Sequence, residues 1–340
     1  MKILILKPSS LGDVIQALPV LRLLKLHLPN SEIFWWIDSG LASLLEGDPD
    51  LAGVVRFERK RWGSPRHWPE AVQSIRWMRQ QNFDWVIDLQ CLARSGAFAW
   101  LANGKLLAGL DEPREGACGF YDVIARRASY HTHAVDWYLS LLPLLGVPVH
   151  RDFIWLPERK DVAAGVKEKW KPDGTRWIAS QPGARWLNKR WPVAHFAELV
   201  RQILARQSDV RFLVLGNKED ELLGDEILRA APERCWNLAG KTSLLETIEL
   251  LRLCELMVTN DTGPMHAAAA LGRPVISIHG PTEPRRTGAY GQMQTALKHA
   301  LPCAPCMKSE CSWNNQMECL IAISPETVCA HVEAALNSPR

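Results

Sequence analysis

Short apolar runs alternate with longer amphipathic segments through most of the sequence, and this alternation restricts the fold more than any other feature. The first series of such segments begins with the apolar run 3–6. Residues 14–28 follow it, and their apolar side chains recur at helical spacing. A second series opens with the run 177–181 and the helical segment 192–207. Repeated strand–helix units with short connections are typical of doubly wound parallel sheets. The sequence therefore predicts an α/β protein with two such domains.

A change of composition marks the expected domain boundary. Between residues 156 and 175, Lys, Glu, Asp and Pro dominate around one amphipathic piece. A chain of 340 residues is also longer than a domain with a single hydrophobic core usually is, and its length fits two domains. We therefore expect an N-terminal domain over 1–157, a linker over 158–175, a C-terminal domain over 176–324 and a C-terminal helix over 325–340.

The composition excludes several classes of protein. A hydrophobic content of 47% and a charged content of 23% are those of a globular protein, and a net charge of +3 is too small to indicate nucleic-acid binding. No apolar run reaches the roughly 18 residues that a membrane span needs. The first seven residues are typical of a buried strand rather than a signal peptide. We expect a cytoplasmic protein that binds no nucleic acid.

The loop Asp261-Thr262-Gly263 lies between an apolar run and an alanine-rich helical segment. Thr262 and Gly263 can present backbone N–H groups to an anion at the positive end of that helix, and Asp261 can hold hydroxyl groups. His266 follows about one turn into the helix. The simpler alternative is an ordinary strand–helix turn capped by an aspartate.

Three further polar loops follow strands of the second series. Residues 182–191 bring three cations, residues 216–220 bring carboxylates suited to ribose hydroxyls, and residues 279–284 close the set. Cations, backbone amides and a carboxylate fit a nucleotide diphosphate sugar better than a dinucleotide, since no Gly-x-Gly-x-x-Gly pattern follows the first strand. A cleft between two such domains suits transfer between two substrates.

The first loop, residues 7–13, places Asp13 at the start of a helix, where a carboxylate is stabilised. Asp13 is either a simple cap or a group that faces a ligand at the carboxyl end of a parallel strand. A basic run overlaps and follows the strand expected over residues 53–57, and it contains Arg56, Arg59, Lys60 and Arg61. Such a run is either a solvated face or a site for phosphates and carboxylates.

Three separated segments resemble glycosyltransferase family 9, the heptosyltransferases of lipopolysaccharide core assembly. They are residues 7–19, residues 182–192 with their Lys-Arg-Trp-Pro end, and residues 261–274, which are followed by His-Gly-Pro-Thr-Glu-Pro at 279–284. The resemblance covers nearly the whole chain. It implies a GT-B fold, with two Rossmann-like domains facing across a cleft. The acceptor would bind the N-terminal half and ADP-L-glycero-D-manno-heptose the C-terminal half, in an inverting reaction without metal or cofactor.

The resemblance also implies roles for single residues. Asp13 matches the general base that takes the proton of the acceptor hydroxyl, and Lys189 matches the lysine that neutralises the diphosphate leaving group. The implied donor-binding residues are Asp261, Thr262, Gly263, His266, Gly183, Arg190 and Glu219, with Asp220 as the alternative to Glu219. The implied acceptor-binding residues are Ser10, Gly12, Arg56, Arg59, Lys60, Arg61, Gln90 and Arg94.

The function implied is transfer of heptose from ADP-heptose to the Kdo/heptose inner core, an anionic lipid-linked oligosaccharide, by an enzyme peripheral to the cytoplasmic face of the inner membrane. A sugar-nucleotide epimerase of the same shape, a homologue with another nucleotide sugar or a protein acceptor, and a binding protein without catalysis remain open. The segments 88–90 and 133–135 look most like the branch that adds the first heptose, although Cys91 stands where that branch usually has glycine.

Four cysteines cluster near the C-terminus with a spacing that is similar to the branches adding later heptoses: Cys303, Cys306, Cys311 and Cys319. The cluster begins like a metal site, but the gap before Cys319 is loose and the family resemblance implies no metal. A thiol-rich or disulfide-capable surface loop is favoured over a structural zinc site. The acceptor hydroxyl and the oligomeric state are left open by the sequence.

Overall fold

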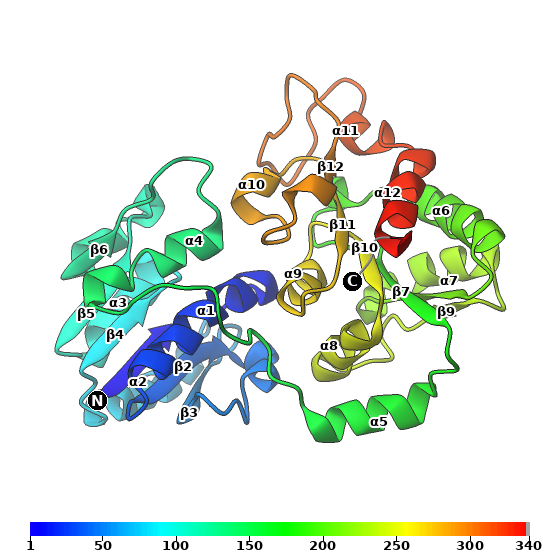
Figure 1. The fold of residues 1–340 in the computed structure, drawn as a ribbon. Coiled ribbons are helices and arrows are strands. Elements are labelled where there is room, and N and C mark those ends of the chain that lie inside the picture. The colour runs from blue at the N-terminus through cyan, green and yellow to red at the C-terminus, as the bar shows by residue number, and fades with distance from the viewer. Residues whose placement is uncertain (338–340) are drawn as a thin grey trace. The chain divides into compact units, whose positions relative to one another are not determined.

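The chain forms two compact units, Met1–Pro157 and Glu158–Arg340. The computed structural model describes residues 1–337. Each unit is built on its own six-stranded parallel sheet with helices packed against it (Figure 1). The predicted α/β class with two doubly wound domains is therefore confirmed.

The sheet of unit 1 has the strand order β3-β2-β1-β4-β5-β6. Helices or short 3-10 turns separate its strands along the chain, and these connections cross over from one parallel strand to the next. The strands are β1 (Lys2–Leu6), β2 (Glu32–Asp38), β3 (Gly53–Phe57), β4 (Trp85–Asp88), β5 (Leu106–Leu110) and β6 (Val123–Ala125).

The helices of unit 1 form two layers, because α1 packs with α4 and α2 packs with α3. They are α1 (Leu11–His27), α2 (Trp68–Gln80), α3 (Ala93–Ala102) and α4 (Ala134–Leu139), with short 3-10 turns η1 (Ser39–Leu44), η2 (Pro65–His67), η3 (Pro113–Glu115), η4 (Ala117–Phe120) and η5 (Pro143–Leu145). The first helix begins at Leu11, three residues before its expected start, because Ser10 already provides a capping box with Asp13.

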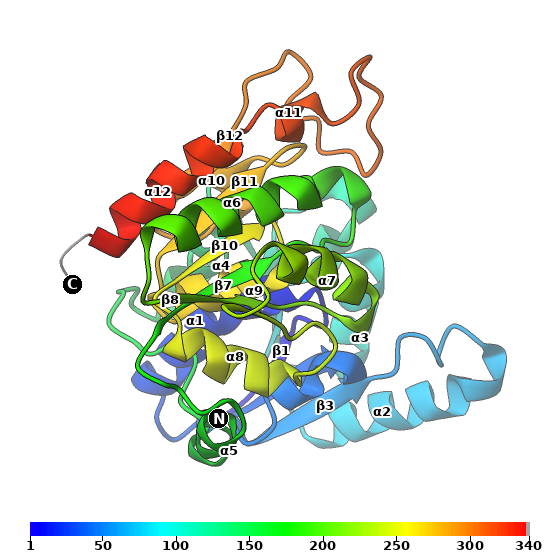
Figure 2. The same cartoon turned by 90° about the vertical axis from the view of Figure 1, so that its right-hand side faces the viewer.

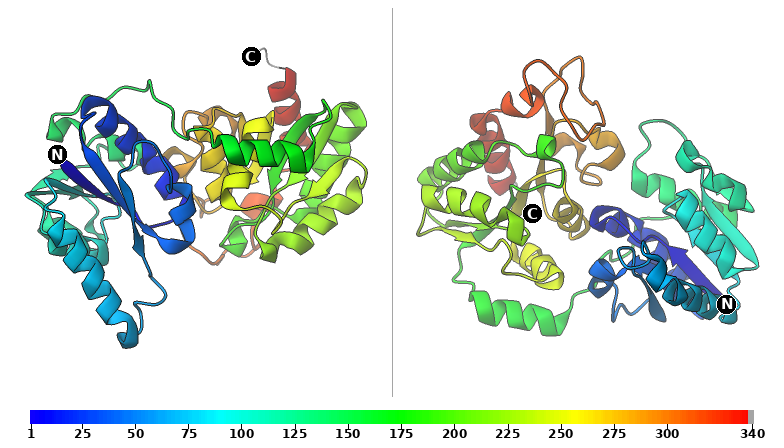
Figure 3. Two further views of the ribbon diagram at one scale, coloured as in Figure 1. Left: turned by 90° about the horizontal axis from the view of Figure 1, so that it is seen from below. Right: turned by 180° about the vertical axis from the view of Figure 1, so that it is seen from behind.

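Unit 2 repeats the architecture with the order β12-β11-β10-β7-β8-β9. Figure 3 shows the layers of both units from below and from behind. The strands are β7 (Arg176–Gln181), β8 (Val210–Val214), β9 (Cys235–Asn237), β10 (Leu256–Asn260), β11 (Val275–His279) and β12 (Ala296–Lys298).

Two layers of helices also cover the sheet of unit 2. The helices α6, α7 and α12 form one layer and α5, α8 and α9 the other, and Figure 2 shows α6 and α8 on opposite sides of the strands. The helices are α5 (Lys160–Trp170), α6 (Val193–Arg206), α7 (Glu221–Ala230), α8 (Leu244–Leu253), α9 (Gly263–Ala270), α10 (Pro284–Thr287), α11 (Glu318–Ile321) and α12 (Pro325–Asn337), with 3-10 turns η6 (Leu187–Lys189), η7 (Lys218–Asp220) and η8 (Met293–Thr295).

Helix α5 lies inside the segment expected to be a linker and packs against α8. The C-terminal helix α12 packs against α6, so both segments contribute to the body of unit 2. None of the helices within residues 1–337 is long and apolar enough to cross a membrane.

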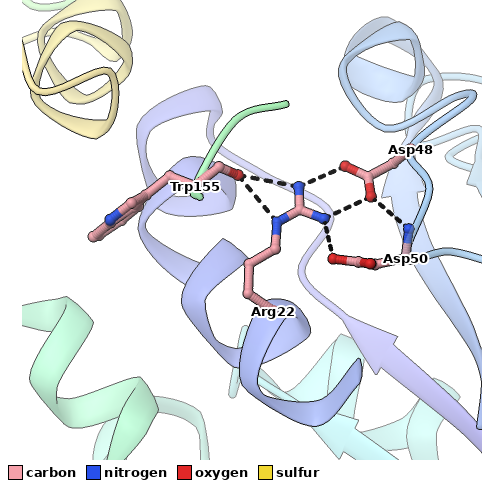
Figure 4. A network of polar contacts seen from close by, with 4 residues as sticks. All are labelled: Arg22, Asp48, Asp50 and Trp155. Atoms are coloured by element: carbon pink, nitrogen blue, oxygen red, sulfur yellow. Dashed lines mark hydrogen bonds and ion pairs between the residues drawn. The ribbon is translucent and has the colours of Figure 1, made fainter. Parts of the chain in front are cut away.

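A buried ion-pair network holds the end of unit 1 against its first helix (Figure 4). The guanidinium of Arg22, in α1, donates to both carboxylate oxygens of Asp48 at 2.6 Å and to Asp50 at 2.7 Å. It also donates to the carbonyl oxygen of Trp155 at 3.0 and 3.2 Å. Removing one partner of such a buried pair typically costs about 3–5 kcal/mol. The network therefore anchors the last residues of unit 1, just before the chain enters unit 2.

Candidate active site

Four polar loops lie at one edge of the unit 2 sheet. They follow β7, β8, β10 and β11, which are adjacent parallel strands and therefore end on the same side. The strand order reverses between β7 and β10, because the chain runs outward from β7 in one direction and then returns to β10. Doubly wound sheets bind ligands at such a point.

An ion pair joins two of these loops. The Nζ of Lys189, in η6, lies 2.8 Å from Oδ2 of Asp261, which follows β10, and 4.7 Å from the ring centroid of Trp186. The side chains are 19% and 8% exposed. Burial would raise the pKa of Asp261, but the neighbouring Lys189 ammonium outweighs it and the pKa is lowered. The environment thus favours the ionised carboxylate of Asp261, and the pair is largely shielded from water.

The helix α9 starts directly beside this ion pair. Thr262 is extended and caps the helix, Gly263 is its first residue, and the Thr262 hydroxyl lies 3.2 Å from that of Thr259. The first amides of a helix lack intrahelical partners and carry partial positive charge. His266 is buried one turn into α9. The structure therefore brings the expected residues Asp261, Thr262, Gly263 and His266 together with Lys189.

Gly183 and Asp220 touch where the loops after β7 and β8 meet. A Cβ atom on Gly183 would lie 2.1 Å from Oδ1 of Asp220, so any larger residue would displace this carboxylate. Asp220 is buried, and Nη2 of Arg190 lies 3.9 Å from its Oδ1. Glu219 is exposed. Of the two carboxylates left open by the sequence, Asp220 is the one that contacts Gly183 and Arg190.

Asn260 connects two of the loops and was missed by sequence reasoning. This fully buried side chain accepts a hydrogen bond from the backbone N–H of Trp191 at 2.9 Å and donates to the carbonyl oxygen of Pro182 at 2.7 Å. Its signal in the sequence is an amide at the last position of an apolar strand. Asn260 thus fixes both ends of the loop that carries Lys189.

In unit 1 the expected general base lies in the first turn of α1, after the central strand β1. Oδ2 of Asp13 accepts hydrogen bonds from the backbone N–H of Ser10 at 2.9 Å and from its hydroxyl at 2.6 Å. The side chain is half-buried, and Gly12 beside it is buried. The carboxylate is therefore held in one orientation by Ser10 while remaining accessible.

Lys7 is a buried cation next to Asp13 that sequence reasoning did not single out. Its Nζ donates to the carbonyl oxygen of Leu89 at 2.9 Å and lies 5.0 Å from the ring centroid of Tyr138. Burial would lower the pKa of Lys7, but Tyr138 and Asp13 raise it. Its signal is a lysine immediately after an apolar strand. The positive charge of Lys7 thus acts on the Asp13 carboxylate.

The other acceptor-side candidates lie on two different strands. Gln90 and Arg94 follow β4, the neighbour of β1, and Arg94 is exposed. The basic cluster belongs to the edge strand β3 and the turn after it, two strands or about 10 Å from β1. All four of its cations are exposed: Arg56, Arg59, Lys60 and Arg61.

Two cations of this basic cluster already have carboxylate partners. Arg56 pairs with Glu46 and Arg61 with Glu70, each at 2.6 Å. Within the described part of the chain, no salt bridge is formed by Arg59, Lys60 or Arg94. The arrangement fits both a solvated basic face and a surface that meets anionic groups.

Comparison with known proteins identifies the family. Residues 72–317 match Glycosyltransferase family 9 (heptosyltransferase). The chain is 31% identical to Lipopolysaccharide heptosyltransferase 1 of Pseudomonas aeruginosa over 100% of this chain and 99% of the relative. It is 41% identical to Lipooligosaccharide heptosyltransferase 2 of Haemophilus influenzae over 88% of each. This chain belongs to glycosyltransferase family 9.

Solved structures of an E. coli heptosyltransferase share the fold. The structure of E. coli heptosyltransferase WaaC with ADP has a TM-score of 0.76 at 26% identity and covers 98% of this chain and 100% of that one. The same enzyme with ADP-2-deoxy-2-fluoro heptose has a TM-score of 0.77 at 25% identity, covering 98% and 99%. The protein is thus a glycosyltransferase, and its two Rossmann-like units are those of the GT-B fold.

The structure explains the unusual cysteine of this family 9 member. Cys91 has φ of 55°, the left-handed region in which glycine is least strained. Its thiol donates to the carbonyl oxygen of Asp88 at 2.9 Å and accepts from the N–H of Leu110 at 3.2 Å. A glycine is the expected residue for this backbone, and here the two thiol contacts hold the cysteine in its place.

The four clustered cysteines line one cavity of about 20 Å³ in unit 2, together with Asn188, Pro281 and Trp313. Their thiols are free. Among the residues that the structure describes, no three or more His, Cys, Asp and Glu side chains are arranged to hold a metal ion. The segment that carries these cysteines lies beside the turn that carries Lys189, since both line the same cavity.

Proposed function

We propose that the protein transfers L-glycero-D-manno-heptose from ADP-heptose to the Kdo/heptose inner core of lipopolysaccharide, with inversion at the anomeric carbon. The observation that carries the proposal is the Lys189–Asp261 pair at the start of α9. A helix start and a shielded ammonium suit a diphosphate. Binding of ADP and of an ADP-heptose analogue by the E. coli relative supports a donor of this class.

The leaving group departs on the unit 2 side. As the bond between the anomeric carbon and the diphosphate oxygen breaks, ADP takes the electron pair and gains negative charge. Lys189 and the first amides of α9 stabilise that charge, so the step is assigned neither a metal nor a cofactor. Asp261 keeps the ammonium in place, and Asp220 or Glu219 binds the ribose.

The acceptor is activated on the unit 1 side. Asp13 takes the proton of the acceptor hydroxyl while that oxygen bonds to the anomeric carbon from the face opposite ADP. Ser10 orients the carboxylate through its N–H and hydroxyl. Lys7 places a buried positive charge close to this carboxylate, and Asp13 in turn helps to raise the pKa of Lys7.

The acceptor is an anionic lipid-linked oligosaccharide. Its phosphates and carboxylates would meet the exposed cations Arg56, Arg59, Lys60, Arg61 and Arg94, with Gln90 and Gly12 near the reacting hydroxyl. Because the acceptor is anchored in lipid, the enzyme acts peripherally at the cytoplasmic face of the inner membrane.

Incubation of the pure protein with ADP-heptose and Kdo–lipid A tests the proposal. Formation of ADP and of a heptosylated lipid that requires both substrates supports it. Isomerisation of the donor without acceptor would instead indicate a sugar-nucleotide epimerase. A thermal-shift screen of ADP-, UDP- and GDP-sugars identifies the donor, because a bound ligand raises apparent stability by mass action.

A further inference from the structure

The turn that carries Lys189 is held at its tip by a residue with no assigned role. The turn η6 comprises Leu187, Asn188 and Lys189. Leu187 is 68% exposed, whereas Asn188 is only 6% exposed. The Nδ2 of Asn188 donates to the carbonyl oxygen of Lys308 at 3.0 Å, although 120 positions separate the two residues. A side chain adjacent to the catalytic lysine thus binds the cysteine segment, defined here as residues 303–319.

The cysteine segment is itself fixed to the loop after β11. The backbone N–H of Met307 donates to the carbonyl oxygen of Pro281 at 2.8 Å. The Sγ of Cys319 lies 3.0 Å from where a Cβ atom on Gly280 would be, so the thiol packs closely on that glycine. Since β11 pairs with β10, which leads to Asp261, a continuous set of contacts runs from η6 back to the partner of Lys189.

Asn188 satisfies only one end of its amide. Its Oδ1 is buried without a hydrogen-bond partner in the described structure, and the residue lines the cavity between the four thiols. A buried acceptor left unpaired is destabilising, which offsets most of the stabilisation from one hydrogen bond. The hydrogen bond from Asn188 to Lys308 therefore adds little net stability to the fold. Its main effect is to fix the position of the turn η6.

We propose that Asn188 is a positioning residue for Lys189: by clamping η6 to the cysteine segment it sets the place of the ammonium at the leaving diphosphate. The inference rests on the proposed role of Lys189 and extends it to the neighbouring Asn188, whose amide holds the turn through Lys308. Loss of the clamp lets the turn shift, which weakens binding of ADP and slows loss of the leaving group. The acceptor side, in unit 1, is unaffected.

Asn188→Asp and Asn188→Ala test the clamp. Aspartate keeps the size but places an anionic acceptor against the Lys308 carbonyl, and alanine removes the amide. Misplacing a catalytic group by about 1 Å can cost on the order of 100-fold, so we expect kcat to fall about 10- to 100-fold with an unchanged KM for the acceptor. Leu187→Ala, in the same turn but exposed, is the matched control and keeps wild-type kinetics. Circular dichroism and the thermal midpoint show whether each variant is folded.

A double-mutant cycle separates positioning from general destabilisation. Calorimetry measures ADP affinity for wild type, Asn188→Asp, Lys189→Met and the double variant, and so works even where turnover is lost. If Asn188 acts through Lys189, Asn188→Asp changes ADP affinity by less than about twofold once Lys189 is methionine. If the two substitutions instead lower ADP affinity by independent factors that multiply in the double variant, the inference is overturned. Wild-type kinetics in both Asn188 variants would also overturn it. If Lys189→Met itself binds ADP and transfers heptose normally, the proposed function of Lys189 fails instead.

Discussion

The two units carry their charged residues in opposite ways. In unit 2 the central cation, Lys189, is paired with a buried carboxylate at the middle of the sheet. In unit 1 the basic cluster lies on the edge strand β3, exposed and partly paired with exposed carboxylates. Shielded charges act strongly on a small ligand at short range, whereas exposed charges act weakly and are screened by salt. The contrast suits a compact nucleotide sugar in unit 2 and a large anionic acceptor in unit 1.

Removal of Asp13, the proposed general base, is expected to have the largest effect. Asp13→Ala should lower kcat by about 10²- to 10⁴-fold, because no group then takes the proton of the acceptor hydroxyl. Donor affinity should stay at the wild-type value, since Asp13 belongs to the other unit. Product formation by mass spectrometry and ADP-heptose titration by calorimetry measure the two quantities. Full activity in this variant would remove Asp13 from the mechanism.

Neutralising Lys189, the shielded cation of unit 2, is expected to have the second-largest effect. Lys189→Met is expected to lower kcat by about 10²- to 10³-fold, the range for losing one preorganised group that stabilises developing charge. In contrast with Asp13→Ala, it should also weaken ADP binding. Steady-state kinetics and ADP calorimetry on the same preparation distinguish the two variants. Equal ADP affinities for both would break the proposed division of labour between the units.

Neutralising the exposed cations of unit 1 should have a smaller, salt-dependent effect. Arg59→Gln combined with Lys60→Gln is expected to raise the acceptor KM by at most about tenfold at low ionic strength, and by less at high salt. ADP affinity should not change. The control is Lys105→Gln, which removes an exposed cation just before β5. Lys105 lies at the amino-terminal ends of the parallel strands, whereas the turn with Arg59 and Lys60 follows the carboxyl end of β3. A salt-independent effect would contradict a screened surface role.

The smallest effect concerns acid stability in unit 2. Hydrogen bonds from Arg285 lower the pKa of Glu283 from 4.5 to about 2. A carboxylate with a lowered folded-state pKa contributes stability that is complete above pH 4.5 and is lost as the pH falls towards 2. Glu283→Gln should therefore lower the thermal midpoint at pH 6 slightly and make no difference near pH 2. A midpoint difference that persists at the lower pH would refute the assignment.

The pattern of residues within a segment was sufficient to predict long strands and helices but not short ones. The strands expected over 3–6 and 177–181 and the helices expected over 14–28 and 192–207 correspond to β1, β7, α1 and α6, because periodicity needs several residues to show. The strands β6, β9 and β12 escaped prediction, and each has three residues and lies at the edge of its sheet. Their conformation comes from hydrogen bonds to one neighbouring strand, which no local pattern records.

The sequence by itself determined the fold class, the family and which loops carry charge, since these depend on residue order and on motifs within single segments. Tertiary structure alone decided that Lys189 meets Asp261 across 72 positions, that Asp220 rather than Glu219 contacts Gly183, and that Asn188 reaches Lys308. The physical reason is the strand order: parallel crossovers bring loops distant in sequence to one edge of a sheet, and packing then selects which side chains are buried there.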